Sequence, residues 1–172
     1  MLRRLALNLF AGWFRLPRWF PTATMRRIRD AIAEGERGHA GELCLAIEAR
    51  QSPWSVLAGV APRDRAERVF SLLRVWDTQD NSGVLLYLQL AERRVELLAD
   101  RGIAARVDPV AWQAICADFA GDMQGGDAAQ AVLACLARIN ALLVEHFPAA
   151  HDNPRELPDD PVVLRAIMRD RL

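Results

Sequence analysis

The chain has 172 residues, of which 52% are hydrophobic and 26% are charged, a balance typical of one globular domain with a substantial core and not of a disordered chain. Its formal net charge is zero, yet residues 1–37 hold eight arginines against three acids, a net charge of +5 that the rest of the chain offsets. The three cysteines, Cys44, Cys116 and Cys135, are widely spaced in apolar sequence, which argues against a disulfide framework or a cysteine metal motif and predicts buried free thiols.

Residues 1–20 place leucines and aromatic side chains at helical spacing, with four arginines between them. Such a basic, aromatic helix can lie in a membrane interface, with its rings at headgroup depth and its guanidinium groups on anionic lipid. It can equally pack on its own domain or on a partner, which is the commoner use of an apolar stripe. The side chains expected to make these contacts are Arg3, Arg4, Trp13, Phe14, Arg15, Arg18 and Trp19.

A membrane-crossing segment is not expected from the sequence. Arg15 and Arg18 interrupt the first apolar run, and no cleavage site follows it, unlike a signal peptide. No window approaches the roughly 18 apolar residues needed to cross a bilayer. We therefore expect a cytoplasmic protein, peripheral at the inner membrane if its N-terminal segment binds lipid.

Helices and strands alternate along the middle of the chain. Residues 22–36 predict a helix, and residues 42–50 alternate between apolar and smaller or polar side chains as a strand does. Residues 64–76 predict the clearest helix, with Trp76 on its inward face.

The segment that follows is the centre of the predicted fold. Residues 84–90 and 94–99 are short apolar runs separated by a turn, which predicts a β-hairpin. Antiparallel arms return the chain to where it started, so the turn-rich segments 77–83 and 100–102 are expected at the same end of the sheet. That end is the candidate functional site.

The rest of the chain is predicted to be mostly helical. Residues 110–122 and 127–146 predict two further helices. The tail over residues 149–161 is rich in Pro, Asp and Asn and is predicted to be an exposed linker, with a short helix over residues 161–169.

The order of these elements predicts an α/β fold. We expect a three-layer α/β/α sandwich: a small mixed sheet that includes the hairpin, a parallel pair joined by a crossover helix, and helices on both faces. Residues 1–37 would form a basic amphipathic helical arm, residues 38–148 the domain, and residues 149–172 the tail.

Oxygen-bearing side chains gather around the predicted hairpin end. Asp77, Asp80 and Asn81 lie in one turn before a buried strand, and Asp100 ends the second arm. Such turns suit calcium or magnesium, so these four residues are the predicted metal ligands, and Arg101 is a predicted anion-binding residue. The alternative is structural, because Asp and Asn also occur in turns for the bonds they make to their own backbone.

Other chemical motifs are absent from the sequence. It has no Gly-rich phosphate loop, nucleophile elbow, H-E-x-x-H pair or C-x-x-C site, which argues against the common enzyme classes that carry local signatures. The basic N-terminus lacks a nucleic-acid reading motif, so no nucleic-acid partner is expected. His39 precedes Glu42 and is expected to form a surface pair with it.

Several short motifs occur in an order that is informative as a whole. They are Gly41-Glu42, Arg74-Val75-Trp76, Asp80-Asn81-Ser82-Gly83-Val84-Leu85-Leu86, Arg93-Arg94-Val95-Glu96, Gly102 and Gly126-Asp127. With this order and spacing, residues 41–148 resemble a TPM domain, the family named after a thylakoid-lumen phosphatase, a photosystem II repair protein and a nematode receptor modulator. The resemblance implies an α/β/α sandwich and, for some members, divalent-metal binding and weak acid phosphatase activity.

Two functions are therefore expected. The first is a non-enzymatic binding module that acts near the membrane, on a membrane protein or on the membrane surface. The alternative is a divalent-metal-dependent phosphatase, a phosphoric monoester hydrolase of weak activity that uses calcium or magnesium. The sequence does not predict an oligomeric state.

Overall fold

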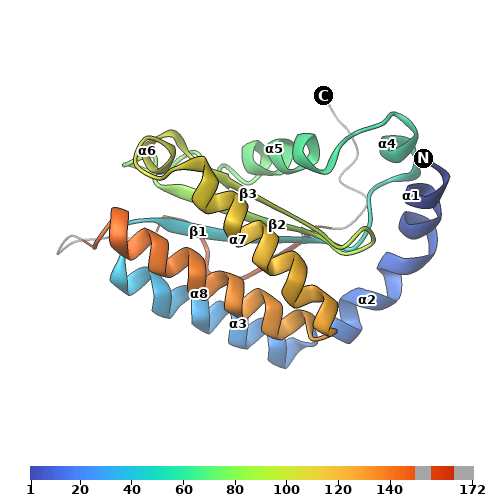
Figure 1. The fold of residues 1–172 in the computed structure, drawn as a ribbon, viewed down its shortest axis with the longest axis horizontal. Coiled ribbons are helices and arrows are strands. Elements are labelled where there is room, and N and C mark those ends of the chain that lie inside the picture. Colours follow the sequence, from blue (N-terminus) through green and yellow to red (C-terminus); the bar gives the residue numbers. More distant parts are fainter. Residues whose placement is uncertain (150–155, 165–172) are drawn as a thin grey trace.

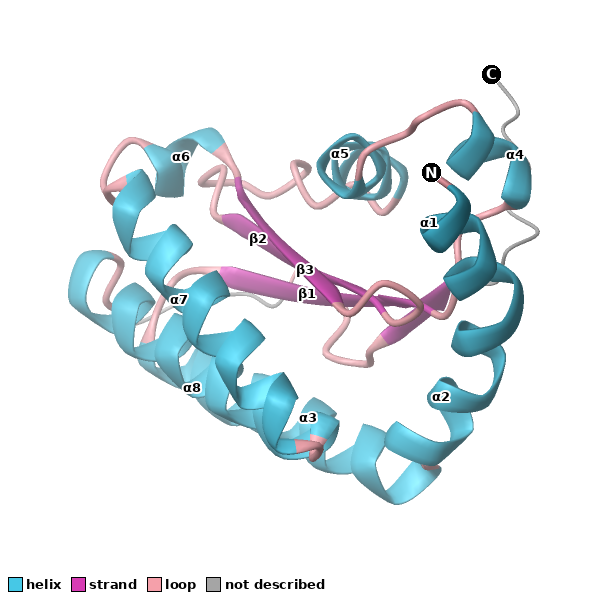
Figure 2. Cartoon of the chain, turned by 45° about the vertical axis from the view of Figure 1, so that its right-hand side comes forward, coloured by secondary structure: helices cyan, strands magenta, loops and turns pink. Residues whose placement is uncertain are grey.

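The computed structural model describes residues 1–149 and 156–164, apart from the side chains of residues 11–13. Figures 1 and 2 show a sheet with helices on both faces and α1 to α2 at one end of it. In chain order the elements are α1 (Leu2–Ala6), the π-helical turn η1 (Leu7–Ala11), α2 (Gly12–Trp19), α3 (Thr22–Gly35), η2 (Glu36–Gly38), β1 (Glu42–Glu48), α4 (Pro53–Leu57), α5 (Pro62–Leu72), β2 (Gly83–Gln89), β3 (Arg94–Ala99), α6 (Arg101–Ala104), α7 (Pro109–Asp122), η3 (Met123–Gly125), α8 (Ala128–His146) and β4 (Val162–Leu164).

The sheet is mixed, with strand order β3-β2-β1-β4. β1 and β2 run parallel with Glu42 opposite Gly83, and β2 and β3 form the antiparallel hairpin with Val84 opposite Ala99. Every residue of the two central strands is buried, as near-continuous apolar runs require when helices cover both faces of a sheet. The predicted hairpin and mixed sheet are confirmed.

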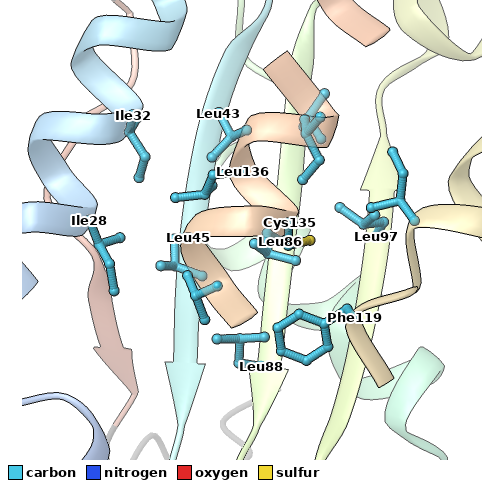
Figure 3. Close-up of a cluster of buried hydrophobic side chains, with 14 of the residues drawn as sticks. Ile28, Ile32, Leu43, Leu45, Leu86, Leu88, Leu97, Phe119, Cys135 and Leu136 are labelled. Carbon is cyan, nitrogen blue, oxygen red and sulfur yellow. The ribbon is translucent and has the colours of Figure 1, made fainter. Parts of the chain in front are cut away.

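Side chains alternate between two cores, one on each face of the sheet. The larger core packs α3, α7 and α8 against one face, and Figure 3 shows Ile28, Phe119 and Leu136 from these helices around strand residues such as Leu45 and Leu86. The smaller core packs α5 on the other face. The predicted three-layer α/β/α sandwich is therefore confirmed, and of the three free thiols Cys44 and Cys135 are buried and Cys116 is partly buried.

The helix predicted over residues 64–76 begins and ends earlier than expected. Pro62 occupies its first turn, and the Asp64 carboxylate accepts the Ala61 N–H at 3.3 Å, so the helix starts at Pro62. It ends at Leu72, and Arg74 adopts a left-handed φ of 56° that turns the chain away. Trp76, predicted to face inward, is 47% exposed.

The tail contributes a strand where a helix was predicted. Val162–Leu164 pairs in parallel with β1, and Leu164 is buried in the smaller core. The prediction of a helix is wrong at these positions because β1 has an open edge that a short run of β-favouring residues can fill; residues 165–169 lie outside the described residues. An edge strand cannot be recognised from its own sequence when its partner is more than 100 residues away.

One described helix, α8, is long and apolar enough to cross a membrane by length and composition. This corrects the expectation that no window reaches that threshold. Ala131, Cys135 and Ile139 lie along one side of α8 in the larger core, so α8 serves as the central helix of that core.

Candidate functional site

The two turn segments at the hairpin end meet, as predicted. The Asp100 N–H donates to the Gly83 carbonyl at 2.8 Å, and the Gly102 N–H donates to the Asn81 carbonyl at 3.0 Å. These backbone bonds place segments 77–83 and 100–102 side by side.

Two glycines permit this close approach. A Cβ at Gly102 would lie 2.4 Å from the Asp80 carbonyl oxygen, and a Cβ at Gly83 would lie 1.8 Å from that of Val75. Asn81 adopts a left-handed φ of 52°, a conformation that Asn tolerates better than most residues. Close backbone packing therefore explains why glycine occupies positions 83 and 102, without any ligand.

The polar side chains at the hairpin end already bind one another. Arg101 Nε donates to Asn81 Oδ1 at 2.6 Å, Asp100 Oδ1 accepts the Arg101 N–H at 2.7 Å, and Asp77 lies 3.5 Å from Arg74 Nε. Asp80 is exposed. Asp100 Oδ2 is buried without a hydrogen-bond partner among the described residues.

This arrangement does not form a ready cation site. The described ranges hold no group of three or more His, Cys, Asp or Glu side chains placed to hold a metal ion. Arg101 also occupies Asn81 Oδ1 and brings a positive charge, which would repel a cation there. Among the described residues of segments 77–83 and 100–102, Asp100 Oδ2 is the buried side-chain oxygen that lacks a hydrogen-bond partner.

Two buried carboxyl groups, Glu36 in η2 and Glu42 at the start of β1, lie side by side. The sequence placed Glu42 at the surface and gave no sign of Glu36. Glu36 Oε1 accepts the Leu43 N–H at 2.8 Å, and Glu42 Oε2 accepts the N–H groups of Glu156 and Leu157 at 3.2 and 3.1 Å. Glu42 therefore holds the returning tail. The other oxygen of each carboxyl group, Glu36 Oε2 and Glu42 Oε1, is buried with no hydrogen bond in the described structure.

Burial determines the protonation of this pair. It raises the pKa of Glu36 to about 8, and the neighbouring Glu42 and Asp159 carboxyl groups add to the rise, whereas the Leu43 N–H opposes it. Burial likewise raises the pKa of Glu42. Charged carboxylates are costly to bury, so burial favours the protonated form of Glu36 in the fold.

The structure contradicts the predicted surface pair of His39 and Glu42. His39 is fully buried, with Nδ1 3.0 Å from the Gly41 carbonyl oxygen and Nε2 3.1 Å from Asn140 Oδ1. Burial lowers the pKa of His39. Local sequence could not show this, because Asn140 comes from α8, about 100 residues away along the chain.

The terminal helices, α1, η1 and α2, dock on the hairpin turn through polar groups. Asn8 is 1% exposed; it donates to Glu92 at 2.9 Å and accepts from the Gln51 N–H and from Gln89 Nε2 at 2.8 Å each. Arg4 forms an ion pair with Glu92 at 2.8 Å. These contacts bury the polar face of the terminal helices.

Arginine and tryptophan extend the same docking along α2. Arg15 Nη1 donates to the carbonyls of Leu90 and Ala91 at 2.7 and 2.9 Å. The Trp19 ring lies against the guanidinium groups of Arg15 and Arg93, 5.2 and 5.7 Å from its centroid, which are cation–π distances. Arg15 and Trp19 are thus used by the fold itself.

The outward face of the terminal helices is apolar. Leu2, Phe10 and Phe14 are 83%, 74% and 75% exposed, and Trp54 on α4, which contacts α1, is 78% exposed. Of the predicted contact residues, Arg3, Phe14 and Arg18 are exposed, Arg4, Arg15 and Trp19 face the domain, and the side chain of Trp13 lies outside the description. Exposure therefore separates the predicted set: three of its members are open to an outside contact and three pack on the domain.

Comparison with known proteins finds a family and similar solved structures. A family model described as the TPM domain matches residues 19–142. A solved structure, the NMR structure of BA42 protein from the psychrophilic bacterium Bizionia argentinensis sp. nov., is similar at 25% identity with a TM-score of 0.73, over 84% of this chain and 95% of that one. No curated protein matches the chain.

Proposed function

Because the chain belongs to the TPM domain family, as the resemblance over residues 41–148 implied, we propose that it is a non-enzymatic binding module held at a membrane surface by its terminal helices. Such a module would act on a partner at the cytoplasmic face of the inner membrane. The supporting observation is that the terminal helices expose large apolar side chains and dock on the hairpin turn through polar ones.

An isolated amphipathic helix normally turns its apolar face to its own domain. Along the first part of this segment, Asn8 and Arg4 face the domain. Although Leu16 and Trp19 further along pack on the larger core, Phe10 and Phe14 face away from the domain. Fully burying one such side chain stabilises by roughly 1.5–3 kcal/mol. A lipid surface that covers this face would gain that free energy without breaking the docking contacts.

Charge favours an anionic surface as the lipid. Arg3 and Arg18 are exposed on the same helices, and each arginine near an anionic leaflet contributes about 1 kcal/mol. The residue set proposed for lipid contact therefore keeps Arg3, Phe14 and Arg18 of the predicted set. It adds the exposed Leu2, Phe10 and Trp54.

Flotation with vesicles that contain anionic phosphatidylglycerol tests the proposal. The double substitution Phe10→Asp and Phe14→Asp should reduce recovery in the floating fraction by about tenfold or more, because two partly buried rings at about 1 kcal/mol each are lost. Val110→Asp is the matched control, since Val110 is exposed on α7, away from the terminal helices, and it should float like the unmodified chain. Equal recovery of all three proteins in the soluble fraction would reject membrane binding.

A divalent-metal-dependent phosphatase is the second candidate, supported by the orphan Oδ2 of Asp100. Calorimetric titration with calcium, magnesium and manganese tests it directly. A saturable heat that is lost in Asp80→Ala or Asp100→Asn, together with loss of phosphate-ester hydrolysis, is the result this candidate requires. No heat at about millimolar metal, a weak affinity for such sites, would reject it.

A further inference from the structure

β3 is an outer strand of the sheet, and a groove of about 590 Å³ runs beside it between α5 and the start of α7. The volume is within the range of ligand-binding clefts. Its lining combines apolar and polar side chains, among them Arg63, Glu96, Leu97, Val107, Trp112 and Cys116.

The positions of the hydrogen bonds between β2 and β3 show which backbone groups of β3 face the groove. Asp100 donates to Gly83, and in an antiparallel pair residues exchange both bonds at every second position. The register then directs the backbone of Glu96 and Leu98 toward β2 and that of Val95, Leu97 and Ala99 away from it. The outer edge of β3 is therefore the floor of the groove.

Only the middle one of these three residues has its outward groups paired. The Leu97 carbonyl accepts Arg63 Nη1 at 2.9 Å, and the Leu97 N–H is directed to the Cys116 sulfur. Across the described ranges, no hydrogen bond is formed by the outward N–H and carbonyl groups of Val95 and Ala99. An edge with such free groups is a template for another strand.

The side chains of the groove favour an acceptor-rich, anionic ligand. Trp112 Nε1 is buried without a hydrogen-bond partner among the described residues, and the Arg63 side chain is 53% exposed. Burial raises the pKa of Glu96, the acid of the lining, and Arg63 and Arg94 oppose that rise. The groove thus offers one donor without an acceptor in the described structure, Trp112 Nε1, and an exposed guanidinium, that of Arg63, which also pairs with Glu67 at 3.2 Å.

We propose that this groove binds an extended acidic peptide segment of a protein partner, which adds to β3 as a further strand. The peptide backbone would pair with Val95 and Ala99, and one peptide N–H would replace Arg63 on the Leu97 carbonyl. The released Arg63 Nη1 would bind a peptide carboxylate, the charge-assisted pairing that Arg favours, while Arg63 Nε keeps its pair with Glu67. Trp112 Nε1 would donate to a peptide oxygen.

This inference rests on the proposed function only in that the domain is a binding module; it uses no residue of the terminal helices. A second copy of the chain is a poorer occupant than an acidic peptide. In a β3–β3 pair centred on Leu97, two Arg63 side chains would meet, and like charges placed opposite each other destabilise a strand pair.

Nuclear magnetic resonance titration of the ¹⁵N-labelled full chain, without lipid, tests the proposal. The probe is acetyl-Thr-Val-Glu-Val-Glu-Val-Thr-amide. One control peptide replaces both glutamates by lysine, and another replaces the central valine by proline, which removes a backbone donor. Saturable shifts are expected for the Val95 and Ala99 amides and the Trp112 indole N–H, with each control peptide binding at least about tenfold more weakly.

Variants of the groove side chains separate its contributions. Arg63→Ala should weaken binding about tenfold, and Trp112→Phe, which keeps an aromatic ring and removes the donor, about threefold to tenfold. Arg26→Ala is the matched control, because Arg26 is exposed on α3, outside the groove, and it should bind like the unmodified chain. Thermal unfolding of each variant shows whether it is folded. The comparison of the three peptides uses the unmodified chain, so it tests the proposal even if a variant does not fold.

Three results would overturn the proposal. The first is the absence of a saturating shift at about 1 mM peptide, a concentration that would detect even weak binding. The second is equal binding of the three peptides. The third is exchange protection of the Val95 and Ala99 amides that rises with protein concentration alone, which would assign the strand edge to a second copy of the chain. Because lipid is absent, failure here leaves the flotation result unaffected, and failure of flotation leaves this titration unaffected.

Discussion

The substitution Glu36→Gln tests whether the fold holds a proton on Glu36 at neutral pH. Glutamine keeps the size of the side chain and can keep the oxygen that accepts the Leu43 N–H. Its amide group cannot ionise, and it supplies a donor toward the neighbouring carboxyl groups of Glu42 and Asp159. The variant therefore removes the titration of this group and little else.

The expected magnitude follows from proton linkage. The pKa of Glu36 is about 8 in the fold and 4.5 for an ordinary Glu. Between these values the unfolded chain has released a proton that the folded chain still holds, so this group lowers the stability of the protein as pH rises, by about 1.4 kcal/mol per pH unit. The variant should match the unmodified chain near pH 4.5 and exceed its stability by up to about 3 kcal/mol at pH 7.

Urea unfolding over a range from about pH 5 to about pH 8, where the linkage term changes most, measures the difference. Glu34→Gln is the matched control, because the Glu34 side chain is 71% exposed in an ion pair with Arg37; its effect should stay within about 0.5 kcal/mol and show no such slope. A stability difference between Glu36→Gln and the unmodified chain that does not change with pH would refute the reasoning. So would a destabilised variant at about pH 8.

Three further substitutions, one of them with a matched control, probe other parts of the structure. Asn8→Ala leaves several buried groups without partners and should lower stability by about 2–3 kcal/mol in urea unfolding, with faster amide exchange in residues 2–19. Gly102→Ala forces a Cβ against a backbone carbonyl and should lower the free energy of unfolding by about 1–3 kcal/mol, whereas Gly121→Ala, with open space around it in α7, should be neutral or stabilising by about 0.5–1 kcal/mol. Tyr87→Phe removes the phenol that donates to the buried Glu48 carboxylate and should cost about 1–2 kcal/mol by the same urea measurement.

Features that depend on local pattern could be predicted from the sequence. The hairpin followed from two short apolar runs and a turn, and its antiparallel geometry alone brought segments 77–83 and 100–102 together. The helix over 127–146 followed from its stripe of small and medium residues and is observed as Ala128–His146. In each case the residues that determine the structure are close together in the sequence.

Features that depend on a distant partner could not be predicted in this way. Val162–Leu164 becomes a strand because β1 offers an edge, and His39 is buried because α8 supplies Asn140. The raised pKa of Glu36 likewise arises from burial, to which Glu42 and Asp159, distant in sequence, add. The sequence did contain a weaker signal for buried carboxyl groups. An acid such as Glu42 or Glu48 within an otherwise apolar strand needs a hydrogen-bond or ion-pair partner from another part of the chain.

The terminal helices show why an apolar stripe alone does not identify the surface that covers it. Helical periodicity groups residues on faces, but the surface of the domain decides which face docks. At the hairpin turn that surface presents Gln89, Glu92 and backbone carbonyls, which need hydrogen-bond partners once buried. Asn8 and Arg15 supply those partners, so polar side chains dock at the hairpin turn. Leu16 and Trp19 pack on the larger core further along the chain, and Phe10 and Phe14 stay exposed.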